Sequence, residues 1–152
     1  GTATSTRCGQ LGRWGDPDRF VGVDRVSPRH GLGRVCVEVD ELIERNVATT
    51  EPVRMEILAG ARTHRHLADL RSTLARAQLL RVEPGDYDTA AGIYRGCRSR
   101  GESVRKLVDC LIAAVALRHH VPVLHSDRDF AAIARTFELS IHEAPGQAER
   151  SR

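Results

Sequence analysis

Aromatic residues are scarce in this sequence of 152 residues, at 4% of the chain, although 41% of it is hydrophobic. A core must therefore be built mainly from Ala, Val, Leu and Ile, which suits a mixed α/β protein. No apolar run approaches the ~18 residues needed to cross a bilayer, so we expect no membrane span. At this length we expect one main domain, because domains cluster near ~100–150 residues.

Closely spaced cysteines are also missing. The four cysteines, Cys8, Cys36, Cys97 and Cys110, form no CxxC pair. That spacing argues against a zinc ribbon or a thioredoxin-like motif and favours free thiols in a reducing compartment. The N-terminal residues lack the apolar core of a secretory signal. We therefore expect a cytoplasmic protein without disulfides.

Lysine is almost absent, since Lys106 is the only lysine among 23 basic residues and the others are arginines. The formal net charge is +3. A planar guanidinium matches phosphate oxygens better than an ammonium does. An excess this small indicates a nucleic-acid partner only weakly, and a GC-rich genome also produces many arginines.

The most informative stretch is residues 103–130. Its first part repeats apolar residues at spacings of three and four, which predicts a helix from its first residue with Asp109 beside the apolar face. Residues 121–124 are apolar and mostly β-branched, which predicts a buried strand, and Asp127 and Asp129 follow its end. In open α/β sheets ligands bind at the carboxyl ends of strands. The stretch therefore predicts an α/β fold with a site at these three aspartates.

The remaining elements are expected on both sides of this stretch, from apolar periodicity, capping residues and turn signals. They are a strand at 20–23, a helix at 35–46, a strand at 47–49, a helix capped by Thr50, a helix at 66–80, a helix capped by Asp86 or Asp88, a short helix at 131–137 and a strand at 139–142.

Two segments carry a family resemblance. VDCLIAA at residues 108–114 and HSDRDF at residues 125–130 resemble the C-terminal half of PIN-domain proteins, and within that family most closely the VapC toxins of bacterial toxin–antitoxin pairs. EPVRMEILAGA at residues 51–61 resembles the family's second acidic motif, with Glu56 as its acid. The resemblance implies a PIN-like domain at 35–143, with a mostly parallel sheet flanked by helices.

Both ends of the chain lie outside this resemblance. Residues 1–34 match the family poorly and are rich in glycine and arginine, so we expect an N-terminal segment with little regular structure. Residues 144–152 form a polar tail. The expected domain is therefore flanked by two less ordered segments.

The resemblance implies a magnesium or manganese site. Glu56, Asp109, Asp127 and Asp129 supply the hard oxygen ligands that such ions prefer, and clustered carboxylates need a cation or a proton to offset their repulsion. On this hypothesis Glu56, Asp109 and Asp127 are catalytic, and the ion positions water for attack on an RNA phosphodiester. Asp129 either binds the ion or orients its neighbour. The alternative for Asp127 is a helix cap.

The family's first carboxylate has only an imperfect counterpart. Asp24 follows the expected strand at 20–23, but Arg25 stands where the family has a hydroxyl residue. Asp16 and Asp18 have no apolar strand before them. Two functions therefore stay open: a metal-dependent endoribonuclease toxin, and a PIN-like module that binds antitoxin or RNA without cleaving.

The resemblance also implies partners, namely an RNA substrate, a cognate VapB-type antitoxin and a second copy of the chain in a homodimer. Arg105 and Lys106, expected on the same helix as Asp109, are candidate contacts to the RNA backbone. Ser126 is a third candidate. No membrane partner is expected.

Overall fold

The computed structural model describes residues 21–23, 48–125 and 127–143. Three short parallel strands form a sheet in the order β1 (Val21–Val23), β2 (Val123–His125) and β3 (Ile141–Glu143). The strand expected at 20–23 is thus confirmed, although it precedes the expected domain boundary at residue 35. Val23, His125 and Glu143 pair across the sheet, so the three carboxyl ends lie side by side.

Several predictions fall outside the described residues. They concern the helix at 35–46, the polar tail, the acids Asp16, Asp18 and Asp24, and Ser126.

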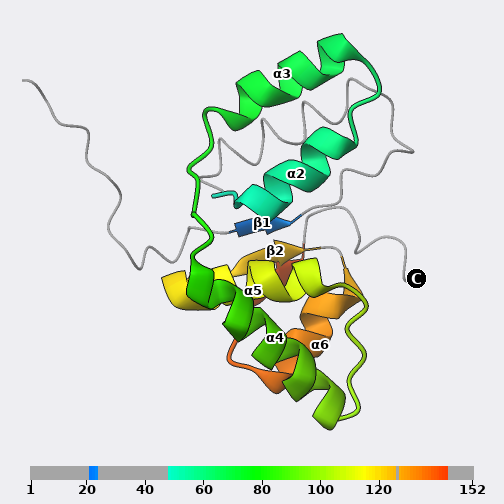
Figure 1. Cartoon of the computed structure of the whole chain (residues 1–152), viewed down its shortest axis with the longest axis vertical. Helices are drawn as coiled ribbons and strands as arrows, with labels where there is room; N and C mark the ends of the chain where they lie inside the picture. The colour runs from blue at the N-terminus through cyan, green and yellow to red at the C-terminus, as the bar shows by residue number, and fades with distance from the viewer. Residues whose placement is uncertain (1–20, 24–47, 126, 144–152) are drawn as a thin grey trace, which may run out of the picture.

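Five helices are described, and none of them is long and apolar enough to cross a membrane. In Figure 1, two of them lie at one end of the molecule and three gather at the other, with β1 and β2 between them. The first two are α2 (Glu51–Ala59) and α3 (His64–Leu74), and the other three are α4 (Pro84–Ser99), α5 (Leu107–His119) and α6 (Arg128–Thr136).

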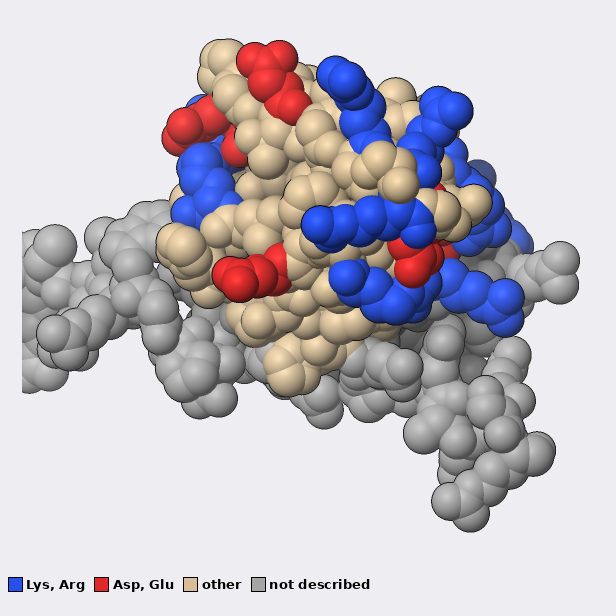
Figure 2. Space-filling model, turned by 90° about the horizontal axis from the view of Figure 1, so that it is seen from below, with Lys and Arg blue, Asp and Glu red and all other residues tan. Residues whose placement is uncertain are grey.

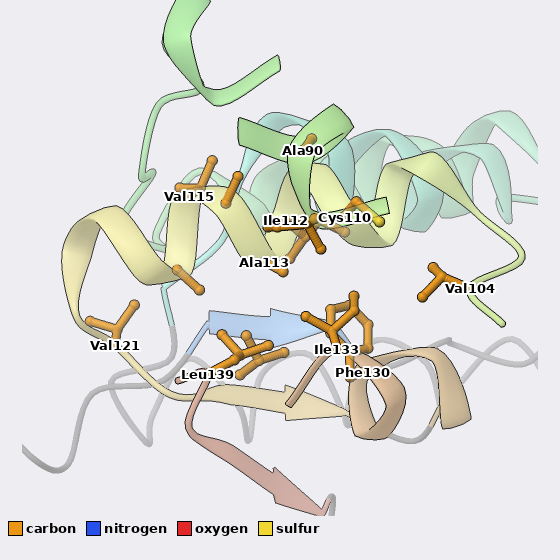
Figure 3. Packing of buried hydrophobic residues seen from close by; sticks show 14 of the residues in the cluster. Ala90, Val104, Cys110, Ile112, Ala113, Val115, Val121, Phe130, Ile133 and Leu139 are labelled. Atoms are coloured by element: carbon orange, nitrogen blue, oxygen red, sulfur yellow. The ribbon is translucent and has the colours of Figure 1, made fainter. Parts of the chain in front are cut away.

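Helix α5 is the centre of the core. Its Ala- and Leu-rich sequence favours a helix, and a run of apolar side chains along it is fully buried. Ile112 of α5 belongs to the same buried cluster as Phe130 and Ile133 of α6, part of which Figure 3 shows. Burying each of these large side chains stabilises the fold by roughly 1.5–3 kcal/mol. The helix ends at His119, and its C-cap, His120, adopts a left-handed conformation with φ 52°.

Helix α3 is shorter than predicted. It ends at Leu74 instead of residue 80 because the chain then turns to form a parallel bridge with the segment before α2. Thr49 N–H donates to the Gln78 carbonyl and Leu80 N–H donates to the Thr49 carbonyl, both at 2.8 Å. The expected strand at 47–49 is thus reduced to this bridge within the described residues, and Thr50 caps α2 as predicted.

Helix α4 begins earlier than predicted. Its N-cap is Glu83, and Pro84 fills the first turn, where a missing N–H costs nothing. Asp86 stands three residues later and accepts the Glu83 N–H at 2.7 Å. The prediction of Asp86 or Asp88 as the cap is therefore wrong. The cap is Glu83, one turn earlier, and Asp86 is the residue of the capping box that binds the backbone N–H of the cap.

Helix α5 begins later than predicted, at Leu107 instead of Ser103. The Arg105 N–H donates to Asp129 Oδ2 at 2.9 Å, which holds the preceding segment extended along the start of α6. Arg105 therefore lies before the helix and Lys106 is its N-cap. The prediction that they share a helix with Asp109 is wrong.

Candidate active site

Two helix starts bring the aspartates of the predicted site to the end of the sheet. Asp109 lies in the first turn of α5 and is 2% exposed. Asp127 is the N-cap of α6, and Asp129 lies in its first turn and is also 2% exposed. Both follow the carboxyl end of β2 at His125. A helix N-terminus favours negative charge, so this placement stabilises carboxylates that would otherwise be costly to bury.

Asp127 and Asp129 share a basic partner. Arg105 Nη2 donates to Asp127 Oδ1 at 3.0 Å, and Arg105 Nε donates to Asp129 Oδ1 at 3.2 Å. Lys106 Nζ lies 3.6 Å from Asp127 Oδ2. Arg105 and Lys106 thus place positive charge beside the carboxylates of Asp127 and Asp129.

The helix-cap alternative for Asp127 is confirmed. Its Oδ1 accepts the Asp129 N–H at 3.4 Å at the start of α6. That role does not use Oδ2, which faces Lys106. Capping and ion binding by Asp127 are therefore compatible, because a carboxylate has about four lone-pair sites.

The charges at this site affect the neighbouring ionisable groups. A hydrogen bond to Asp129, then the charges of Asp129 and Asp127, raise the pKa of Arg105, so the guanidinium stays charged. Burial raises the pKa of the Cys110 thiol to about 12, with smaller contributions from Cys97, Asp109 and Asp129. Cys110 is therefore a protonated core residue and not a nucleophile.

Glu56 comes from a different part of the fold. It lies in the middle of α2, half-buried, and α2 packs against α5, which carries Asp109. Across residues 48–125 and 127–143, no three His, Cys, Asp or Glu side chains are arranged to hold a metal ion. In kind, the donors fit a hard divalent cation, since Glu56, Asp109 and Asp127 offer only carboxylate oxygens.

A second ionic cluster was missed by the sequence reasoning. Arg118, in the last turn of α5, donates to both carboxylate oxygens of Asp86 at 2.9 Å and to Glu83 Oε1 at 3.2 Å. It also donates to the Arg81 carbonyl at 2.7 Å. The cluster joins the start of α4 to the end of α5. Its residues are 32 or more positions from Arg118 in the sequence, so no local sequence pattern predicts the contact.

Comparisons with known proteins identify the family of this chain. The PIN domain family matches residues 34–136, so this chain belongs to the PIN-domain family. Within it the chain is of the VapC ribonuclease type. It is 44% identical over 111 residues, covering 68% of this chain and 81% of the relative, to VapC ribonuclease Mb1587 of Mycobacterium bovis and to ribonuclease VapC11 of Mycobacterium tuberculosis.

Solved structures share the fold. VapBC-5 of Mycobacterium tuberculosis, a member of the VapBC family of toxin–antitoxin systems, matches with a TM-score of 0.58 and 26% identity, over 84% of this chain and 100% of that one. VapBC2 of Rickettsia felis, solved with a fragment of its promoter DNA, matches with a TM-score of 0.60 and 13% identity, over 83% and 98%. The predicted α/β PIN-like fold is thereby confirmed.

Proposed function

We propose that this protein is the toxin of a toxin–antitoxin pair and a metal-dependent endoribonuclease. The observation that carries the proposal is the pair Asp127 and Asp129 directly after β2, with Asp109 in the first turn of α5, in a chain whose relatives are VapC ribonucleases. The same aspartates follow from the family motifs in the sequence. RNA phosphodiester hydrolysis is the reaction for which such carboxylates are suited.

Asp109 and Asp127 are the proposed direct ligands of Mg²⁺ or Mn²⁺, with Glu56 completing the set and Asp24 as a further candidate. When bound, the ion would supply Lewis-acid activation of water and of the scissile phosphate. Asp129 accepts the backbone N–H and the Nε–H of Arg105, one on each oxygen. It holds Arg105 beside Asp127 and stays a candidate ligand, because a carboxylate has about four lone-pair sites.

Arg105 and Lys106 are the proposed RNA contacts, with Ser126 as a third. The Arg105 side chain is 66% exposed although it is bonded to two aspartates, so part of its guanidinium faces solvent. A guanidinium has five N–H donors, and only two are used in these side-chain bonds. Arg105 can therefore bind a phosphate oxygen while it keeps its contact with Asp129.

The proposed partners are a VapB-type antitoxin and a second copy of this chain. The proposal follows the VapBC structures that share the fold, since these are toxin–antitoxin systems. A location in the cytoplasm stays a prediction from the sequence.

The decisive experiment is RNA cleavage by the purified full chain with Mg²⁺, with EDTA and as Asp109→Asn. We expect cleavage only by the wild type with Mg²⁺, and an unchanged circular dichroism spectrum for the variant, because Asn keeps the volume and removes a ligand charge. In cells, expression of the wild type should arrest growth, whereas expression of Asp109→Asn should be tolerated. Loss of folding in the variant would show that Asp109 is structural.

The second candidate, a PIN-like module that binds without cleaving, is favoured by one observation. Arg105 and Lys106 already engage Asp127, a proposed ligand. In that case the wild type would bind antitoxin or RNA but release no RNA fragments at any Mg²⁺ or Mn²⁺ concentration. Asp24→Ala would then change nothing, whereas an active enzyme that uses Asp24 as a ligand would lose most of its cleavage.

A further inference from the structure

Basic side chains form a band that leads from the end of α4 to the carboxylate site. Between residues 98 and 106 four basic residues and one acid give a local net charge of +3, as large as that of the whole chain. Figure 2 views the molecule from below and shows Lys and Arg gathered on one side, with acidic side chains between them. We call the band the basic strip. It consists of Arg98, Arg100, Arg105, Lys106, Arg128 and Arg135.

The contacts of the basic strip show how its residues are arranged along α6. At the last turn of that helix, Arg100 donates to the Thr136 carbonyl, and Arg135 forms two bonds of 2.7 Å to Glu102. At the first turn, Arg105 binds the site carboxylates. The segment after α4 thus runs antiparallel to α6 and ends at the site. The nine residues of α6 span about 13 Å at 1.5 Å per residue.

The strip is exposed and held in place. Arg98, Arg100, Arg105, Arg128 and Arg135 are exposed, and Lys106 is half-buried. The guanidinium of Arg98 lies over the ring of Tyr94, 5.9 Å from its centroid. Arg135 uses Nε and Nη2 for Glu102, which leaves other N–H donors for a ligand. Guanidinium groups fixed in this way lose little entropy when they bind a phosphate.

We propose that the basic strip is the track that binds the sugar–phosphate backbone of the substrate RNA and leads the scissile phosphate to Asp109 and Asp127. This inference rests on the proposed function. A line of positive charges about 13 Å long is long enough to contact more than one phosphate of a single RNA strand.

The test uses the full chain and two matched double variants. Arg98→Gln with Arg100→Gln removes the end of the strip far from the carboxylates. Arg62→Gln with Arg65→Gln removes two exposed arginines from the start of α3, at the other end of the molecule. Both change the net charge by the same amount, so a difference between them reports position and not total charge.

Affinity for a fluorescein-labelled single-stranded RNA of mixed sequence is measured in EDTA, from about 50 to 200 mM NaCl. For the strip variant we expect weaker binding and a slope of log K against log salt that is shallower by about 1.4, because each lost phosphate contact removes about 0.7. For the α3 variant we expect the wild-type slope. The double variant Arg98→Lys with Arg100→Lys should show most of the wild-type slope, because it keeps both positive charges. Thermal melting checks that each variant is folded.

A second readout separates this inference from the proposed function. Hydrolysis of bis(p-nitrophenyl) phosphate with Mg²⁺ should be unchanged in the strip variant, because that compound is too small to reach Arg98 from the carboxylates. A wild type that hydrolyses no phosphodiester would defeat the proposed function and leave the RNA-binding result intact. Equal slopes of log K against log salt for the strip variant and the α3 variant, or no RNA binding by the wild type, would overturn the proposal that the basic strip binds RNA.

Discussion

At the scale of the residue, burial decides which acidic and thiol groups are chemically available. Asp109 and Asp129 are almost fully buried yet lie at helix starts, where partial positive charge stabilises them. Cys97 and Cys110 are free cysteines that are equally buried, but the helix core around them offers no such compensation. The aspartates therefore stay available for chemistry and the thiols do not.

The thiols supply the first prediction. The pKa of Cys110 is raised to about 12 by burial, then by the charges of Cys97, Asp109 and Asp129, so almost no thiolate exists near neutral pH. In the native protein neither Cys97 nor Cys110 should react with iodoacetamide within hours, whereas both should react in urea. Peptide mass spectrometry measures each site separately. Rapid labelling of Cys110 in the native state would contradict its placement in the core.

At the scale of the element, the paired helices α4 and α5 are joined by apolar packing and by a partly buried ionic cluster. Ile93 and Cys97 of α4 pack into the same core as α5. Asp86 and Arg118 join the opposite ends of the two helices. Within α4 the glycines differ in their surroundings, since Gly92 faces open space and Gly96 lies under the ring of Phe137.

The two glycines give a matched pair of variants. Gly92→Ala should raise the free energy of unfolding by about 0.5–1 kcal/mol, because alanine restricts the unfolded chain and a methyl group meets nothing within 4 Å. In Gly96→Ala the new Cβ would lie 2.7 Å from Cζ of Phe137, so the ring must move. Urea denaturation should show Gly96→Ala to be less stable than Gly92→Ala. Equal stabilities would mean that Phe137 moves at no cost.

Asp86 gives a prediction about pH. Burial alone would raise the pKa of Asp86, but hydrogen bonds from Arg118 and from the Glu83 N–H, together with nearby positive charge, lower it below 3.8. A lowered pKa in the folded protein adds stability above the unfolded pKa, and this stability is lost as the pH falls through the folded value. Asp86→Asn should therefore cost about 1–3 kcal/mol at pH 7.

The difference between Asp86→Asn and the wild type should shrink below about pH 4 and nearly vanish once Asp86 is protonated. Urea denaturation from pH 7 down to pH 3 measures it. Asp88→Asn, an exposed site on the same helix, is the control and should change stability by less than ~0.5 kcal/mol. A constant difference across this pH range would show that the charge of Asp86 does not stabilise the fold.

At the scale of the whole molecule, the site depends on elements that are far apart in the sequence. The candidate ligands come from α2, α5 and the N-cap of α6, and the parallel pairing of β1 with β2 brings residues 21–23 beside residues 123–125. Surface residues of the same elements are apolar, such as Met55 of α2 at 61% exposed and Leu107 of α5 at 60%. Single exposed apolar side chains are normal on a protein surface, so Met55 and Leu107 serve here as positions at which to test the expected homodimer.

The last prediction concerns assembly. We expect two copies of the 16.8 kDa chain to associate, so that sedimentation equilibrium reports about twice the chain mass at micromolar concentration. Met55→Glu and Leu107→Glu place charge at exposed apolar positions and should weaken the dimer if either lies in its interface. The matched control is Tyr87→Glu, at a third exposed position. A monomer at all concentrations would contradict the expected homodimer.

The sequence by itself determined the family, the first strand and the position of Asp127 and Asp129 after a buried strand, because these depend on local patterns. An apolar run followed by Asp-x-Asp places carboxylates at the end of a strand whatever surrounds it, and VDCLIAA predicts a buried helix that carries Asp109. Only the tertiary structure decided where α5 begins and what Asp129 does. Its carboxylate takes the N–H of Arg105 from 24 residues along the chain, and no local pattern records a hydrogen bond that exists only after α6 has packed.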